Sequence, residues 1–177
     1  IIPFNFPIEL TFQKIAPALA MGNTVLVKAP SANPLAVLAL DKYAKVAGLP
    51  EGVLQFFTSD HEAVNEHIIA NPKVDAISLT GSTAAGKRMV KAGADTLKRT
   101  FLELGGNDAL LIFEDADLDR ALDEMVTSRM ENNGQVCCSS KRFLVQRSIY
   151  DEVAKRLVER LTALKRGSAL DEEAAVT

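Results

Sequence analysis

The sequence contains little cysteine and little histidine, and this scarcity excludes two kinds of site. Its 177 residues include only two cysteines, the adjacent Cys137 and Cys138, and only two histidines, His61 and His67. Adjacent cysteines lie too close for ordinary disulfide geometry, so we expect no disulfide within the chain. No CxxC spacing is present and both histidines lie far upstream of the cysteines, so we expect no metal site.

Long apolar runs and basic runs are missing as well. No stretch approaches the roughly 20 apolar residues that span a bilayer. The net charge is -3, without the basic cluster that a nucleic-acid surface requires. We therefore expect neither a membrane nor a nucleic acid as a partner, and the 47% hydrophobic content is typical of a globular protein.

The two ends of the chain carry no signal of a complete protein. The first residue is Ile1 rather than Met, and the chain stops at Thr177 without a helix-end or strand-end pattern. We expect a piece of a longer protein, in which a targeting peptide is neither visible nor excluded. Adjacent cysteines are prone to oxidation, so a reducing, cytoplasmic location is favoured.

Strand-like and helix-like segments alternate along the chain. The expected strands are 24–28, 53–57, 75–79, 100–104, 109–113 and 142–145, and the expected helices are 34–47, 61–70, 83–94, 118–132 and 150–165. This rhythm predicts an α/β fold with a doubly wound parallel sheet. The pattern restarts after a Gly-Gly pair, which predicts one domain at 1–105 and the start of a second α/β domain at 106–177.

One loop has the features of an anion site. The expected strand ending at Leu79 runs into TGSTAAGK, and a helix begins inside this loop. Backbone N–H groups and the helix dipole favour an anion there, while Gly81 permits close approach and Ser82 adds a hydroxyl. The loop matches neither GxGxxG nor GxxxxGK[ST]. A simple helix cap at Ser82 or Thr83 explains the same residues.

The cysteine pair sits in NNGQVCC, directly after the expected helix 118–132. Cysteine most often packs as a small buried hydrophobe, which is one explanation of the pair. The other is thiolate chemistry, which requires an acid–base partner and donors that stabilise the charge formed on the substrate.

Four separated motifs occur in one order along the chain. They are PFNFP at 3–7, GST at 81–83 followed by Gly86, ELGGN at 103–107 and GQVC at 134–137. Together they closely resemble the aldehyde dehydrogenase superfamily, from Ile1 to about Ala175. Family members are much longer than this chain, so the resemblance implies the later part of a Rossmann-like NAD(P)-binding domain and the first part of the catalytic domain.

The resemblance implies roles for four catalytic residues. Cys137 matches the nucleophile that attacks the aldehyde carbonyl, and Cys138 is then a spectator. Asn5 and the cysteine N–H match the donors that stabilise the alkoxide, and Glu103 matches the base that activates water. Lys14 matches a lysine that assists proton transfer, although a solvated surface lysine explains it equally well. The apolar neighbours of Glu103 predict that it is partly buried.

The resemblance also implies a nicotinamide cofactor, NADP or NAD. Lys28 matches a lysine that reaches the adenine ribose, Ser82 matches a pyrophosphate contact, and the cofactor-binding set extends to Gly81, Gly86 and Leu104. Many family members have a glutamate three residues after that lysine, where this chain has Ser31. Loss of this carboxylate removes repulsion of a 2′-phosphate, so we expect NADP to be accepted, unless Ser31 is neutral to the choice.

The substrate is expected to be a small aldehyde. The positions that match the family's substrate tunnel are Phe6, Leu10, Gln13, Glu131, Val136 and Cys138. A succinate-semialdehyde-like substrate would need a cation, which Arg129 supplies if it turns inward and which Glu131 opposes.

Two alternatives stay open at this point. A CoA-acylating aldehyde dehydrogenase would pass the thioester to coenzyme A, but such relatives generally lack the glutamate found at Glu103. An inactive nucleotide-binding module is the other alternative, and we expect the isolated 177-residue chain to be inactive. The family implies a homodimer or homotetramer for the longer protein.

Overall fold

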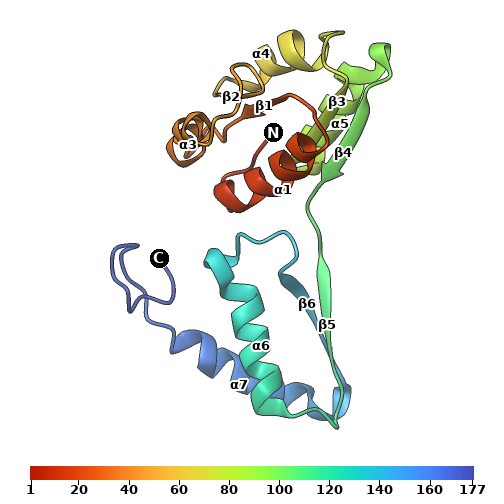
Figure 1. Cartoon of the computed structure of the whole chain (residues 1–177). Coiled ribbons are helices and arrows are strands. Elements are labelled where there is room, and N and C mark those ends of the chain that lie inside the picture. The colour runs from red at the N-terminus through yellow and green to blue at the C-terminus, as the bar shows by residue number, and fades with distance from the viewer. The chain divides into compact units, whose positions relative to one another are not determined.

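The computed structural model describes all residues from Ile1 to Thr177, which form two compact units, Ile1–Gly105 and Gly106–Thr177 (Figure 1). Each unit combines helices with strands, and the strand pairs are parallel. The α/β fold class with parallel strands is therefore confirmed. The two units are described one after the other.

The first unit contains two parallel strand pairs. The strands are β1 (Val25–Lys28) with β2 (Leu54–Phe57), and β3 (Ala76–Thr80) with β4 (Arg99–Glu103). All four lie within one or two residues of their expected positions. Because parallel strands end at the same edge of a sheet, each pair brings its carboxyl-terminal loops together.

The first two residues of the chain join these strand pairs. The backbone nitrogen of Ile1 donates to the oxygen of Ser78 in β3 at 2.7 Å, and Thr80 donates back to Ile1 at 3.2 Å. Ile2 donates to the oxygen of Lys28 in β1 at 3.2 Å. The segment Ile1–Ile2 thus lies between β1 and β3 and bonds to both.

The helices of the first unit differ from expectation in three places. They are α1 (Pro7–Ala20), α2 (Leu35–Leu38), α3 (Leu40–Val46), α4 (His61–Ala63), the π-helix η1 (Val64–Ile69), α5 (Thr83–Gly93) and the 3₁₀ turn η2 (Ala94–Thr96). The expected helix 34–47 is divided at Ala39, where Lys42 bonds back only three residues. The expected helix 61–70 continues as a π-helix.

Helix α1 has no counterpart among the expected elements. Pro7 occupies the first turn, where a missing N–H costs nothing, whereas Pro17 lies inside the helix and obscures the pattern. The hydroxyl of Thr11, which is fully buried, donates to the oxygen of Pro7 at 2.6 Å. This bond satisfies a buried polar group and fixes the first turn.

Two apolar clusters form the core of the first unit. One contains Ile2, Ile15, Val27, Ala29 and Val37, and the other contains Val64, Ile69, Ile77, Leu79 and Met89. The second cluster joins α5 and η1 to β3, so it fixes the two elements that flank the loop between β3 and α5.

A glycine permits α5 to approach β4 closely. A β-carbon at the buried Gly86 would lie 3.1 Å from Cδ2 and 3.3 Å from Cδ1 of Leu104. Leu104 follows β4 directly, so the packing of Gly86 against Leu104 fixes the helix relative to the strand. These two residues therefore have a structural role here, whatever their relation to a cofactor.

The second unit is a smaller α/β layer. It contains β5 (Asp108–Ile112), α6 (Leu118–Met130), η3 (Glu131–Gly134), β6 (Ser140–Val145), η4 (Arg147–Ile149) and α7 (Tyr150–Thr162). Figure 1 shows α6 and α7 beside the parallel β5–β6 pair. Their shared core is formed by Ile112, Leu122, Met125 and Val153.

Exposed ion pairs join the outer faces of α6 and α7. Arg156 and Arg160 lie 2.5 Å and 2.6 Å from the same carboxylate oxygen of Asp119. Exposed pairs of this kind stabilise little individually, so the apolar core dominates the packing of the two helices. No helix of the chain combines the length and the apolar character that a bilayer crossing requires.

Replacement of Gly86 tests the close packing of α5. Gly86→Val should lower the free energy of unfolding by about 1–3 kcal/mol, because its side chain must displace Leu104. Ala84→Val is the control, since Ala84 is exposed on the same helix and adds only the small helix cost of a β-branched residue. Urea denaturation measures both values, and equal losses in the two variants would contradict the packing argument.

Candidate active site

The residues expected to be functional are divided between the two units. Asn5, Lys14, Glu103 and the nucleotide-binding candidates belong to the first unit, and the cysteine pair belongs to the second. Within each unit the structure gives the local contacts of these residues.

Asn5 lies in a segment that is fixed on both sides. Before it, Ile2 bonds to β1; after it, the oxygen of Phe6 accepts the N–H of Leu10 at 3.0 Å in the first turn of α1. The side-chain amide of Asn33 donates to the oxygen of Phe4 at 2.9 Å. Asn5 is therefore held on an ordered segment rather than on a free loop.

Lys14 of α1 is directed toward β3 and Glu103. Its ammonium donates to the hydroxyl of Ser78 at 3.1 Å. Burial lowers the pKa of Lys14 below its usual range, and the negative charge of Glu103 opposes this shift. Lys14 is thus half-buried and bonded, which is not the environment of a freely solvated surface lysine.

The expected partial burial of Glu103 is wrong, because this residue is exposed at the end of β4. Alternate residues of β4 face opposite sides, and those on the side of Glu103, including Phe101 with 60% of its surface exposed, are uncovered. The backbone oxygen of Glu103 accepts the N–H of Gly81 at 2.9 Å. The carboxylate therefore lies beside the loop that follows β3.

Lys28 is a buried lysine at the end of β1. Only 3% of its surface is exposed, and its ammonium donates to the hydroxyl of Ser31 at 2.9 Å. Burial lowers the pKa of Lys28, while the carboxylate of Asp60 opposes the shift. The neutral partner Ser31 leaves this cation weakly compensated, so an anionic ligand would be favourable here.

The loop after β3 begins helix α5. The hydroxyl of Ser82 accepts the N–H of Ala85 at 3.1 Å, so Ser82 is the N-cap of an eleven-residue helix. Ser82 and Thr83 are exposed, which leaves the N–H groups of the first turn accessible. The cap and the anion site are compatible, since the Ser82 hydroxyl hydrogen stays available to a ligand.

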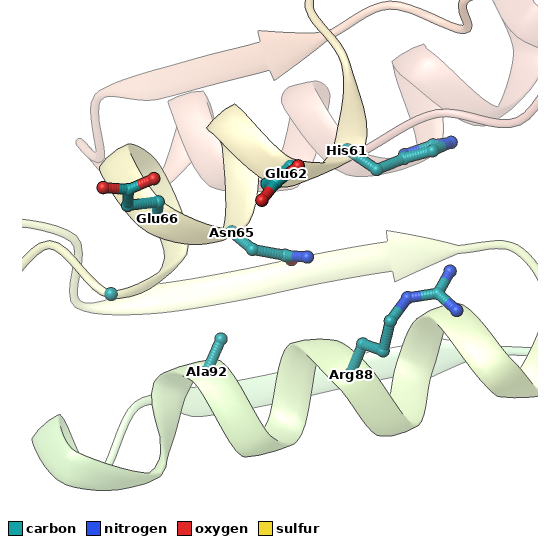
Figure 2. Close-up of a pocket in the computed structure, with 7 residues that line it drawn as sticks. His61, Glu62, Asn65, Glu66, Arg88 and Ala92 are labelled. Carbon is teal, nitrogen blue, oxygen red and sulfur yellow. The ribbon is translucent and has the colours of Figure 1, made fainter.

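A surface pocket of about 740 Å³ lies between α5 and the α4–η1 segment. Figure 2 shows Asn65 and Arg88 extending from the two helical segments into this space, while Glu66 turns away. A second, smaller pocket of about 50 Å³ is lined by Lys28, His61 and Arg88 among others. The pocket region thus connects the buried lysine of β1 with the first turns of α5.

The second unit presents both cysteines on an exposed turn, with free thiols. The turn follows three consecutive residues with positive φ, namely Asn132 at 47°, Asn133 at 57° and Gly134 at 77°. Asparagine tolerates this left-handed region better than most residues, and glycine adopts it without cost. The expected helix 118–132 therefore ends at Met130, and the chain reverses before the cysteines.

A guanidinium and a glycine hold this reversal. Nη1 of Arg129 donates to the oxygen of Gly134 at 3.2 Å and reaches the hydroxyl of Ser139 at 3.5 Å. A β-carbon at Gly134 would lie only 2.7 Å from the same Nη1. Arg129 thus spans the cysteine loop through Nη1, and its role as a substrate cation stays a prediction.

The carbonyl groups of the cysteine turn converge on one lysine. The ammonium of Lys141, which follows in β6, donates to the oxygens of Val136 at 3.1 Å, Cys137 at 2.8 Å and Ser139 at 3.2 Å. Gly106 lies on the same side, since a β-carbon there would be 3.1 Å from the Cys137 oxygen. The thiols of the same turn are exposed.

The residues expected in a substrate tunnel have mixed environments. Leu10 packs against the first apolar cluster, Val136 is buried, and the amide of Gln13 donates to Glu9 at 3.1 Å. Phe6 is half-buried, whereas Glu131 and Cys138 are exposed. Apart from the backbone bond between Phe6 and Leu10, nothing in these contacts points to a shared tunnel, so their tunnel role stays a prediction.

Several features of the site were missed from the sequence. The contacts of Lys141 and Arg129 depend on the tight reversal after α6, which was not among the expected elements. The pocket lined by Asn65 and Arg88 requires two helices from different parts of the chain. The one available signal was the Asn-Asn-Gly run, which favours left-handed backbone and therefore a reversal.

The fold and the site together define a class of protein. The chain has an α/β fold with parallel strands, a capped glycine loop beside a pocket, and an exposed cysteine turn that offers a candidate thiol nucleophile. The family model described as "Aldehyde dehydrogenase family" matches residues 1–177. The chain belongs to the aldehyde dehydrogenase family, and the resemblance carried by its four motifs is confirmed.

Three similar proteins indicate the breadth of this family. The chain is 41% identical over 177 residues to a "Probable succinate-semialdehyde dehydrogenase [NADP(+)]" of Sinorhizobium fredii, covering 99% of this chain and 36% of that protein. It is 42% identical over 176 residues to a geranial dehydrogenase of Castellaniella defragrans, covering 99% and 37%.

Among solved structures, a 3,6-anhydro-L-galactose dehydrogenase in complex with NAP has a TM-score of 0.93 at 38% identity, with coverage of 97% of this chain and 36% of that one. The chain therefore spans little more than a third of the length of the relatives it matches.

Two glycines with the same backbone geometry test the hold of Arg129 on the cysteine loop. Gly134→Ala should lower the free energy of unfolding by about 1 kcal/mol more than Gly22→Ala, because only the first methyl displaces a bonded guanidinium. Gly22 has φ of 78° and no atom within 4 Å of a β-carbon, so both variants share the left-handed backbone cost of about 1–2 kcal/mol. Thermal or urea unfolding compares them, and a smaller loss at Gly134 would contradict the assigned contact.

Proposed function

We propose that the protein containing this chain oxidises an aldehyde to its carboxylic acid, with NADP or NAD as hydride acceptor, through a covalent intermediate on Cys137. The observation that carries the proposal is the exposed Cys137 thiol on an ordered turn, in a chain that belongs to the aldehyde dehydrogenase family. An exposed, backbone-anchored cysteine is suited to nucleophilic attack, whereas a packing cysteine would be buried.

The first step forms a bond between Sγ of Cys137 and the carbonyl carbon. The electron pair of the C=O bond moves to oxygen, and the alkoxide is stabilised by the side-chain amide of Asn5 and the backbone N–H of Cys137. A nicotinamide nucleotide, when bound, would supply the hydride acceptor that converts the thiohemiacetal to a thioester. The remaining steps belong to the protein's own residues.

Hydrolysis of the thioester requires a base. Glu103 takes a proton from water, the resulting hydroxide attacks the acyl carbon, and the C–S bond breaks to release the acid and the Cys137 thiolate. The exposure of Glu103 gives water direct access to the carboxylate. Lys14, whose ammonium donates to Ser78 and interacts with the charge of Glu103, then assists in removing the proton.

The nucleotide would lie beside the loops that follow β1 and β3 in the first unit. The pyrophosphate would accept hydrogen bonds from the first-turn N–H groups of α5 and from the Ser82 hydroxyl. The adenosine end would lie in the pocket lined by Asn65 and Arg88. Lys28 and Ser31 would meet the ribose hydroxyls or a 2′-phosphate. A phosphate there compensates the buried ammonium of Lys28, which supports acceptance of NADP.

The relatives leave the choice of aldehyde open, because one is named for a semialdehyde and another for geranial. With Nη1 of Arg129 bonded to its own loop, the succinate-semialdehyde-like guess rests on the relatives rather than on a described cation. The homodimer or homotetramer implied by the family stays a prediction.

Paired cysteine variants test the proposed nucleophile. In the absence of CoA, the protein that contains this chain should form reduced cofactor from a panel of aldehydes that includes a semialdehyde and geranial. Cys137→Ala should abolish turnover, whereas Cys138→Ala should keep it within about fivefold, because only the first removes the nucleophile. Activity that appears only after CoA is added would instead indicate acyl transfer, and activity in neither condition would favour a nucleotide-binding module.

The Ser31→Glu substitution tests cofactor choice. A carboxylate beside Lys28 would pair with the ammonium and repel a 2′-phosphate, so the NADP/NAD ratio of kcat/KM should fall by at least about tenfold. Ser31→Gln is the control of similar size without the charge, and it should shift the ratio less. An unchanged ratio in the Glu variant would remove Ser31 from the account of specificity.

A further inference from the structure

Lys141 contacts the peptide group that precedes Cys137. The oxygen of Val136 and the N–H of Cys137 belong to the same peptide unit, and the Lys141 ammonium lies 3.1 Å from that oxygen. The same ammonium is 2.8 Å from the oxygen of Cys137 and 3.2 Å from that of Ser139. One cation therefore binds the carbonyls on both sides of the nucleophile.

The effect of such a cation on a peptide follows from its electronic structure. An amide is polarised along O=C–N–H, so a positive charge at the oxygen withdraws electrons from nitrogen and makes the N–H a stronger donor. Charged donors form shorter and stronger hydrogen bonds than neutral ones. The N–H of Cys137 is the donor assigned above to the developing alkoxide.

We propose that Lys141 is a positioning residue that polarises the Val136–Cys137 peptide, so that the N–H of Cys137 becomes a stronger oxyanion donor. The inference rests on the proposed function, because it concerns the alkoxide formed in that reaction. It adds a role for Lys141, which touches neither substrate nor the reacting sulfur.

The backbone around the turn agrees with this role. The turn is also closed by the N–H of Ser139, which donates to the Val136 oxygen at 3.4 Å, so this oxygen accepts from two donors. Arg129 anchors Gly134 on the other side of the cysteines. Lys141 is thus the cation bound to the carbonyls next to the nucleophile, and Arg129 holds the preceding reversal.

Two reactions of the same sulfur separate polarisation from simple support of the turn. Attack on an aldehyde creates an alkoxide that needs the Cys137 N–H, whereas alkylation by iodoacetamide displaces iodide and creates no alkoxide. Loss of polarisation slows only the first reaction. Loss of the turn geometry slows both.

The experiment uses the protein that contains this chain and compares the wild type with three variants, Lys141→Met, Lys141→Gln and Lys141→Arg. The burst of reduced cofactor measures the aldehyde step, and peptide mass spectrometry measures the rate at which iodoacetamide labels Cys137. Lys141→Met should slow the burst by about tenfold, less than the roughly 100- to 1,000-fold lost with an oxyanion donor itself. Its labelling rate should stay within about twofold.

The other variants complete the test. Lys141→Arg keeps the charge and should recover most of the burst rate. Lys141→Gln keeps a neutral donor and should be slow in the burst but normal in labelling, and it replaces the Met variant if that protein does not fold. Lys155→Met is the control, because Lys155 is an exposed lysine of α7 in the same unit.

Each outcome decides the proposal. A burst that slows while labelling holds supports polarisation by Lys141. Equal losses in both reactions, or a Met variant as fast as the wild type, would overturn it. These results differ from failure of the proposed function, which would appear as a wild-type protein that forms no reduced cofactor from any aldehyde.

Discussion

The turn that carries Cys137 gathers its backbone carbonyl groups around one cation. Backbone carbonyls are strong acceptors, and Lys141 donates to three of them, while Gly106 leaves room for the Cys137 oxygen. Arg129 and the N–H of Ser139 close the same reversal. An ordered backbone thus presents the exposed sulfur, as a nucleophile requires.

The first unit gathers its polar residues by the geometry of parallel strands. Strands β1, β3 and β4 end at Lys28, Thr80 and Glu103, and the carboxyl ends of parallel strands lie at the same edge of a sheet. The segment Ile1–Ile2 bonds to β1 and β3 and thereby brings the two pairs into one arrangement. The basic Lys28, the α5 N-terminus and the Glu103 carboxylate consequently occupy neighbouring loops of one unit.

Much of this arrangement could be predicted from sequence, and the exceptions have physical causes. Strand positions followed from β-branched and apolar runs, and the resemblance to the family followed from motifs that are short but ordered. Helix α1 was missed because Pro17 is ordinarily a helix breaker, although here the helix continues past it to Ala20. The exposure of Glu103 was predicted wrongly because apolar neighbours along a strand alternate between two faces, and only one face of β4 packs against α5. The Lys141 contacts could not be predicted at all, since they depend on the exact path of a turn.

The most direct test of the account is to find the covalent intermediate. The protein as its gene encodes it would be mixed with aldehyde and NADP, quenched in acid within the first turnover and digested, and the cysteine peptide would be sequenced by mass spectrometry. The account predicts an acyl group, two hydrogens lighter than the aldehyde adduct, on Cys137 and only when the cofactor is present. An acyl group on Cys138, or turnover without any acylated cysteine, would contradict it.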